Sequence, residues 1–243
     1  MSYFLSKVPL QIGTTLELTD DEARHILLSR RIEVGEMIEI QDPAGKRFEA
    51  KVIDIDRKSL SIQAISEIKT PKESPLKITV FQALIKEQPL DNIIQKLTEL
   101  GVDYLVLFYS ENSVERFKEI EKKLVRWRKI SEEAAKQSGR VKSANIEFID
   151  SFENLKSMNE SLEQIFILDP NSIQTFSTWG LRSQVNKIGI LVGPEGGFTA
   201  TELEQFSSLR NVMPTNLGPR ILRADTAAIA SAAITQSLWG DMN

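Results

Sequence analysis

Two glycine- and proline-bearing segments near the end of the chain have the residue types and spacing to bind a small molecule. The first, Ile188–Phe198, reads Ile-Gly-Ile-Leu-Val-Gly-Pro-Glu-Gly-Gly-Phe, and the second, Asn216–Ala227, reads Asn-Leu-Gly-Pro-Arg-Ile-Leu-Arg-Ala-Asp-Thr-Ala. In each segment an apolar run ends in a turn where glycine permits close backbone approach and proline stiffens the chain. Such loops after strands predict a ligand site in an α/β protein, whereas two ordinary tight turns are the alternative interpretation.

The composition of these loops narrows the class of ligand. Neither loop ends in the Gly-Lys-Ser/Thr of a phosphate-binding loop, and neither has the Gly-x-Gly-x-x-Gly spacing of a dinucleotide turn. A ligand would instead be held by backbone groups and apolar side chains, which suits a flat, mostly uncharged group such as adenine. These side chains are Leu191, Val192, Leu217, Ile221 and Leu222.

The loops resemble the two signature loops of the bacterial small-subunit ribosomal RNA uridine-N3-methyltransferases, which belong to the SPOUT class. The matching residues are Leu191–Phe198 and Leu217–Arg223. Three further segments are similar to family patterns in the same order: Arg24-His25 with Arg31 and Gly35, Gln95–Gly101, and Glu133–Arg140. Five ordered matches across nearly the whole chain make the resemblance specific.

The resemblance implies methylation of N3 of a uridine in 16S ribosomal RNA, with S-adenosyl-L-methionine as cofactor. Two alternatives stay open: a non-catalytic RNA-binding module of the same fold, and a methyltransferase that acts on another RNA such as transfer RNA. The non-catalytic alternative is motivated by Ala224-Asp225-Thr226, where the family usually has Thr-Glu-Thr. The expected cofactor-binding residues are Leu168, Leu191, Val192, Gly193, Pro194, Glu195, Gly196, Leu217, Gly218, Ile221, Leu222 and Arg223.

The reaction requires help from the protein because uridine N3 carries a proton near neutral pH. Cations that favour the uridine anion, or a carboxylate base, would supply that help. We expect Arg220 and Arg223 to stabilise the base or its phosphate, with a structural ion pair as the alternative for each. We also expect Gly196→Val to abolish cofactor binding, because the added side chain would intrude into the site. The residues expected to contact RNA are His25, Arg31, Gln137 and Arg140.

The partners expected from the resemblance are ribosomal RNA and a second copy of the chain. A small-residue face on the last helix would let two helices approach closely in a homodimer, and packing within one chain is the alternative; its residues are Ala227, Ala228, Ala230, Ala232 and Ala233. Arg116–Lys142 holds ten Lys or Arg against four Glu, which suits RNA or simply a solvated helix face. Because the net charge of the whole chain is −4, we expect the assembled small subunit rather than naked RNA as the substrate.

Composition excludes several classes of site. The 243 residues contain no cysteine and one histidine, which rules out disulfides, thiolate metal sites and multi-histidine metal sites. We therefore expect no metal. The longest apolar runs are far too short to span a membrane, and no signal peptide is apparent, so we expect a cytoplasmic protein without a membrane partner.

The sequence pattern of residues 76–243 predicts an α/β domain, whose strands and helices position the two loops. Strands are expected at 78–85, 104–108, 146–149, 165–168, 188–192 and 211–215, and helices at 90–100, 119–138, 152–162, 199–207 and 225–238. Thr199 with Glu202 reads as a capping box, and Asp225 or Thr226 as the cap of the last helix. The alternation predicts a parallel sheet covered by helices on both faces. The resemblance adds a trefoil knot, an exception to the general rule against knots.

Residues 1–70 read as a smaller, β-rich domain. Alternating residues at 37–40, 48–52 and 60–64, separated by turns, predict a small antiparallel barrel or sandwich, and Thr19 starts a capping box before a short helix at 23–28. The resemblance identifies this domain as a PUA-like β-barrel that binds RNA. Residues 71–75 form a polar, proline-bearing linker between the two domains.

Overall fold

The chain separates into two compact units. The computed structural model describes residues 3–19, 23, 26–27, 32–70, 72–180 and 185–242. Unit 1 comprises Met1–Lys72 with Lys136–Lys142, and unit 2 comprises Glu73–Ala135 with Ser143–Asn243. The division therefore falls inside the expected linker. The inclusion of 136–142 in unit 1 was not expected from the sequence.

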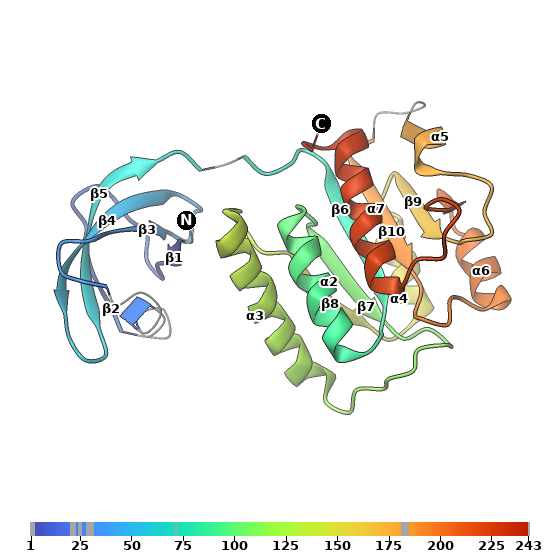
Figure 1. Cartoon of the computed structure of the whole chain (residues 1–243), viewed down its shortest axis with the longest axis horizontal. Coiled ribbons are helices and arrows are strands. Elements are labelled where there is room, and N and C mark those ends of the chain that lie inside the picture. Colours follow the sequence, from blue (N-terminus) through green and yellow to red (C-terminus); the bar gives the residue numbers. More distant parts are fainter. Residues whose placement is uncertain are drawn as a thin grey trace. The chain divides into compact units, whose positions relative to one another are not determined.

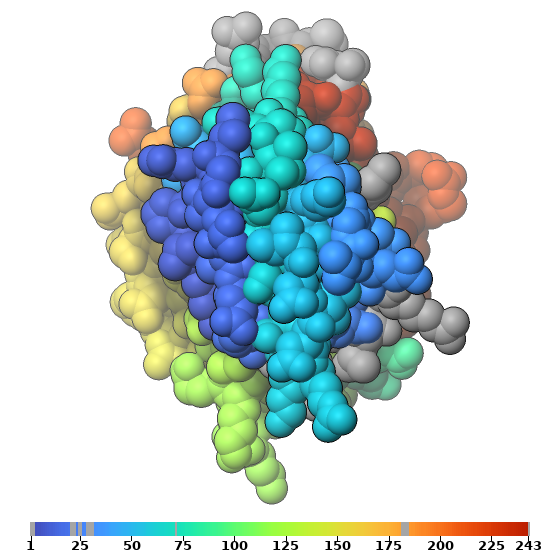
Figure 2. Space-filling view, turned by 90° about the vertical axis from the view of Figure 1, so that its left-hand side faces the viewer, coloured from blue at the N-terminus to red at the C-terminus, as the bar shows by residue number. Residues whose placement is uncertain are grey.

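Unit 1 is built on one curled five-stranded sheet with the order β1-β3-β4-β5-β2. The strands are β1 (Phe4–Leu5), β2 (Thr15–Leu18), β3 (Met37–Gln41), β4 (Arg47–Ile55) and β5 (Leu60–Ile68). All neighbours are antiparallel except β1 and β3. Figure 2 shows blue N-terminal residues beside the teal residues of β5, as the β2–β5 pairing requires. The predicted small β domain is confirmed, and its sheet is an open half-barrel in the described residues.

Alternation along β3, β4 and β5 builds the core of unit 1. Side chains on one face are buried together: Ile38, Ile40, Phe48, Ala50, Val52, Leu60, Ile62 and Ala64. Ala23 and Ile26 are helical and join this core, but the rest of the expected 23–28 helix lies outside the described residues. β1 and β2 were not expected from the sequence because each is too short to show a pattern.

Unit 2 contains a six-stranded sheet in which every neighbouring pair is parallel, with the order β11-β9-β10-β6-β7-β8. The strands are β6 (Lys77–Ala83), β7 (Tyr104–Phe108), β8 (Asn145–Ile149), β9 (Gln164–Leu168), β10 (Lys187–Val192) and β11 (Val212–Thr215). The helices are α2 (Glu87–Glu99), α3 (Ile120–Ser138), α4 (Phe152–Asn159), α5 (Phe176–Gly180), α6 (Ala200–Ser207) and α7 (Ala224–Trp239), and α3 ends within the 136–142 segment of unit 1. The predicted parallel α/β architecture is confirmed.

The two faces of this sheet carry separate apolar clusters. On β6, Val80 belongs to the cluster with α2, α3 and α7, whereas Phe81 belongs to the cluster with α4 and α6. Successive strand residues point to opposite faces, so both faces must be apolar and both must be covered. Figure 1 shows α2 and α7 side by side over the sheet. Strand order does not define how the chain is threaded, and the trefoil knot stays a prediction.

The N-terminal cap of α6 agrees with the sequence-based expectation, whereas that of α7 differs from it. The capping box of α6 is present, since Glu202 N–H donates to Thr199 Oγ1 and Thr199 N–H donates to Glu202 Oε2. The expected cap of α7 is wrong: the N-cap is Arg223, without a side-chain cap bond. Because α7 begins at Ala224, Asp225 already lies in the first turn, where its Oδ1 accepts from Thr226 N–H at 2.9 Å. No helix in the described part of the chain is long and apolar enough to cross a bilayer.

Candidate functional site

A cavity of about 570 Å³ lies at the carboxyl ends of three adjacent strands of unit 2. β11, β9 and β10 are neighbours in the sheet, and the loops that follow them converge on the start of α7. Its volume is within the range of small-ligand sites, and the carboxyl edge is where open α/β sheets bind ligands. The lining residues fall into three strand-end segments plus α6 and α7: 168–171, 192–198, 215–218, 220–224, Leu203 and Ala227.

The loop after β10, residues 193–198, is held by a turn and by an aromatic anchor. Gly197 N–H donates to the carbonyl of Pro194 at 2.9 Å, which closes the turn. Phe198 then packs beneath it, with ring centroids 5.1 Å from Phe206 of α6 and 6.4 Å from Phe108 of β7. The loop backbone is therefore fixed at both ends, as a preformed ligand wall requires.

The loop after β11, residues 216–223, forms the opposite wall. Asn216 Oδ1 accepts from Gly218 N–H at 3.0 Å, and Asn216 N–H donates to the carbonyl of Gln174 at 2.8 Å. Gly218 has a φ of +105°, a conformation that L side chains rarely adopt, so glycine is needed here. After Gly218 the loop becomes exposed, and Ile221 has 87% of its surface accessible.

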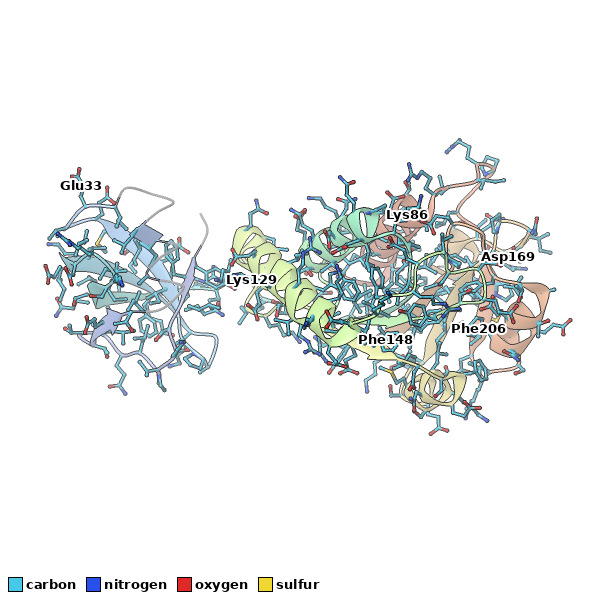
Figure 3. All side chains as sticks on the ribbon, turned by 90° about the horizontal axis from the view of Figure 1, so that it is seen from below. Glu33, Lys86, Lys129, Phe148, Asp169 and Phe206 are labelled. Carbon is cyan, nitrogen blue, oxygen red and sulfur yellow. The ribbon has the colours of Figure 1, made fainter. Side chains whose placement is uncertain are left out.

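The segment after β9 brings a carboxylate into the cavity. Asp169 is half-buried in the lining, and its Oδ1 accepts from Asn171 N–H at 2.9 Å, which fixes the carboxylate. Figure 3 labels Asp169 in unit 2. The sequence analysis did not select this residue. The sequence signal for Asp169 was its position immediately after the apolar run 165–168. This run forms β9, which lies between the two strands that carry the loops, so the residue after it lies near both loops.

The charged groups of the cavity are two carboxylates and two arginines. Asp169 and Glu195 lie in the lining together with the expected catalytic residues Arg220 and Arg223. Both arginines are exposed. Arg223 Nε lies 3.8 Å from Asp225 Oδ1, but with 77% of its side chain exposed this ion pair is weak. The arrangement presents cations at the solvent side of the cavity, where an anionic partner would meet them.

The cavity brings together all but one of the expected cofactor-binding residues. Leu191 is the exception, because its side chain is 1% exposed and belongs to the core on the α4–α6 face, whereas Val192 lines the cavity. Alternation along β10 explains the difference. The reasoning for Gly196 also changes, since a Cβ there would lie 3.2 Å from Asn112 Cβ rather than simply projecting into the cavity.

The structure describes two of the four residues that we expect to contact RNA, Gln137 and Arg140. His25 and Arg31 lie outside the described residues. Gln137 is exposed, but Arg140 is 8% exposed and therefore presents little surface to an RNA. Both belong to the 136–142 segment of unit 1 and not to the unit that contains the cavity.

Part of the basic charge on α3 is neutralised by α2. Arg126 makes two hydrogen bonds with Asp91, at 2.7 and 2.6 Å, and Lys123 Nζ lies 2.7 Å from Glu87 Oε1. These contacts favour a structural role for that part of the segment. The small-residue face of α7 also serves the same chain, because Ala228 and Ala232 are fully buried in its core.

Comparison with known proteins identifies the family of the chain. The RNA methyltransferase domain matches residues 72–236, and the RNA methyltransferase PUA domain matches residues 18–65. The chain belongs to the RNA methyltransferase family. The family resemblance found in the sequence is thereby confirmed, and unit 2 carries the methyltransferase domain of this family.

Relatives of this family are similar to the chain over nearly its full length. Ribosomal RNA small subunit methyltransferase E of Bacillus subtilis is 30% identical and covers 98% of this chain and 97% of its own. The protein of the same name from Buchnera aphidicola is 30% identical over 92% and 88%. Among solved structures, the enzyme of that name from Neisseria gonorrhoeae, bound to S-adenosyl methionine, is 32% identical with a TM-score of 0.87 and covers both chains fully. A Legionella pneumophila methyltransferase with bound SAM is 27% identical, with a TM-score of 0.88 over 98% of both chains.

Proposed function

We propose that this protein transfers a methyl group from S-adenosyl-L-methionine to N3 of a uridine in 16S ribosomal RNA. The observation that carries the proposal is the cavity formed by the two signature loops at the ends of β10 and β11. The SAM-bound relatives from Neisseria gonorrhoeae and Legionella pneumophila support the choice of cofactor. The names of the Bacillus subtilis and Buchnera aphidicola relatives support ribosomal RNA as the substrate.

The lining fits this cofactor in shape and in charge. Val192, Leu217 and Leu222 offer apolar side chains for the adenine, between two loops whose backbone is already fixed. Asp169 and Glu195 place negative charge in a cavity that would hold a sulfonium and an ammonium group. S-adenosylmethionine supplies, when bound, a methyl group on a positively charged sulfur.

The protein's own contribution to the reaction is electrostatic. Arg220 and Arg223 lie in the lining and are exposed, so they can approach the uridine or its phosphate. A cation beside the base lowers the free energy of the N3 anion relative to the protonated base, and this favours loss of the N3 proton. We assign Arg220 and Arg223 this role, and we leave the identity of a base open between solvent and a cavity carboxylate.

The partners proposed are ribosomal RNA in the assembled small subunit and a second copy of the chain. The match of unit 1 to the RNA methyltransferase PUA domain supports a role of this unit in RNA binding. We keep Gln137 as the exposed candidate for RNA contact in this unit. We propose a cytoplasmic homodimer because the family resemblance implies one.

A methylation assay on three RNAs tests the function. Purified protein and radiolabelled S-adenosylmethionine are incubated with small ribosomal subunits, naked 16S RNA or transfer RNA from a strain that lacks this protein, and the nucleosides are identified by mass spectrometry. We expect N3-methyluridine in the small subunits, less in naked RNA and none in transfer RNA. Label in transfer RNA alone would instead support the alternative substrate, and cofactor binding without any transfer would support a non-catalytic module.

A further inference from the structure

A turn outside the lining of the cavity holds the 193–198 loop from behind. This turn, Ser110–Ser113, follows β7, and Asn112 lies at its tip. Asn112 Nδ2 donates to the carbonyl of Gly197 at 3.0 Å. It also donates to the carbonyl of Gly196 over a longer distance of 3.4 Å. Gly196 and Gly197 both line the cavity. One side-chain amide therefore contacts two consecutive backbone units of the wall.

The turn that carries Asn112 is itself fixed at both ends. Ser113 N–H donates to the carbonyl of Ser110 at 3.1 Å, and Ser110 N–H donates to Ser113 Oγ at 3.1 Å. The next amide, Glu111 N–H, donates to Glu202 Oε1 at 2.9 Å. Glu202 is 7% exposed, and its second oxygen caps α6. The position of Asn112 is thus set by α6, which begins directly after the 193–198 loop.

The packing of Gly196 against Asn112 limits how the loop can move. A Cβ built on Gly196 would lie 3.2 Å from Asn112 Cβ, which is tighter than most Cβ contacts, and at an ordinary contact distance of 3.6 Å from Asn112 Cγ. The missing side chain of Gly196 therefore lets the loop backbone lie directly on Asn112. Contact and hydrogen bonds together place the two peptide units that face the cavity.

We propose that Asn112 is a positioning residue for S-adenosylmethionine, which it serves by fixing the carbonyls of Gly196 and Gly197. This inference rests on the proposed function, because it takes the cavity as the cofactor site. Without the amide donor, the loop would sample other conformations, and cofactor binding would have to restore the ordered one. The free energy needed to order the loop would weaken cofactor affinity. The fold would be kept, because Asn112 is exposed and lies outside the apolar cores.

Replacing the Asn112 amide by a carboxyl group of the same shape distinguishes the effect of its hydrogen bonds from the effect of its packing. In N112D the ionised carboxylate would place an acceptor against two carbonyl oxygens and would repel the loop. Once protonated, the carboxyl group regains one donor. The cofactor affinity of N112D should therefore rise as the pH falls, a dependence that packing alone would not produce.

Calorimetric titration of the full chain with S-adenosylmethionine at pH 7.5 and 4.5 tests the proposal. We expect N112A to bind about three- to tenfold more weakly than wild type, the loss of one ordinary hydrogen bond. We expect N112D to bind more than about tenfold more weakly at pH 7.5, since repulsion adds to that loss, and to recover part of its affinity relative to wild type at pH 4.5, which is close to the usual Asp pKa of about 3.9. The matched control is N186D, because Asn186 is exposed at the opposite end of β10 and gains the same charge.

The outcomes distinguish this inference from the proposed function. Equal affinities of wild type, N112A and N112D would overturn the role of Asn112 and leave the cofactor site intact. Absence of binding by folded wild-type protein would overturn the cofactor site itself. Should N112D fail to fold, N112A with hydrogen exchange at residues 195–198 gives the answer: faster exchange with weaker binding supports the proposal, and unchanged exchange contradicts it.

Discussion

Arg220 is exposed in the lining of the cavity, and the proposed mechanism requires its charge to act on the uridine there. We predict that Arg220→Ala lowers kcat for methylation of small subunits by about 10²-fold, the usual cost of removing one electrostatic stabiliser. The affinity for S-adenosylmethionine should change little. The measurement is steady-state kinetics with calorimetry, and Arg220→Lys should retain part of the activity because the charge stays. A variant with wild-type kcat would remove Arg220 from the mechanism.

Gly218 tests whether backbone conformation at the 216–223 loop matters for binding. Its φ is +105°, and Gly13 of unit 1 has a similar φ of +90°, with open space around both. We predict that Gly218→Ala and Gly13→Ala each destabilise their unit by about 1–2 kcal/mol through backbone strain. Only Gly218→Ala should weaken cofactor binding. Thermal unfolding and calorimetry on both variants check this, and equal affinities would show that the loop tolerates the strain.

At the scale of elements, α2 and α3 are joined by ion pairs that should respond to acid. The hydrogen bond from Lys123, followed by the Coulomb attraction of Lys123 and Arg126, lowers the pKa of Glu87 below its usual value of 4.5, although partial burial opposes this. A carboxylate whose pKa is lowered in the folded state contributes stability above the unfolded pKa and loses it as the pH falls through the folded pKa. The contribution is therefore present at neutral pH and is lost as the pH falls below 4.5 and through the lowered pKa of Glu87.

We predict that Glu87→Gln destabilises the protein at pH 7 by at most about 1 kcal/mol, because solvent reaches both side chains of the pair, which are 33% and 36% exposed. The difference from wild type should vanish as the pH is lowered below 4.5. Denaturant unfolding across this pH range measures it. The matched control is Glu204→Gln on the exposed face of α6, which should show a smaller and less pH-dependent effect.

At the scale of the whole molecule, Arg47 connects the sheet of unit 1 to the 136–142 segment. It is 5% exposed, stacks 3.8 Å from the ring centroid of Tyr3, and donates from Nη2 to the carbonyl of Gly139 at 3.2 Å. Gln41 Nε2 adds a 2.7 Å bond to the carbonyl of Val141. This arrangement explains why a segment distant in sequence belongs to unit 1.

We predict that Arg47→Ala destabilises unit 1 by about 2–3 kcal/mol, because charge-assisted bonds and buried carbonyl partners are lost together. Hydrogen exchange at 137–142 should increase. Cofactor affinity should stay at the wild-type value, because every residue that lines the cavity lies in unit 2. We expect Arg47→Lys to destabilise unit 1 somewhat less than Arg47→Ala, since lysine keeps the charge but loses the planar stacking on Tyr3. A large change in cofactor affinity would contradict the prediction that Arg47 acts within unit 1 alone.

The sequence by itself determined the family, the strands of unit 2 and its helices except α5, and 12 of the 22 residues that line the cavity. These depend on local patterns: the apolar runs that end at Val192 and Thr215, and the glycines and prolines that follow them. It did not reveal that the side chain of Leu191 is buried on the α4–α6 face, because a fully apolar run does not show which of two buried faces a residue occupies.

Only the tertiary structure decided which distant residues meet. The order β11-β9-β10 puts Asp169 between the two loops, and Asn112 reaches Gly196 across 84 residues of sequence. The 136–142 segment likewise joins unit 1 through Arg47. Local patterns fix which residues form strands and turns, but pairing of parallel strands joins segments far apart in the chain. The contacts between such segments are set by packing and hydrogen bonding in the complete fold.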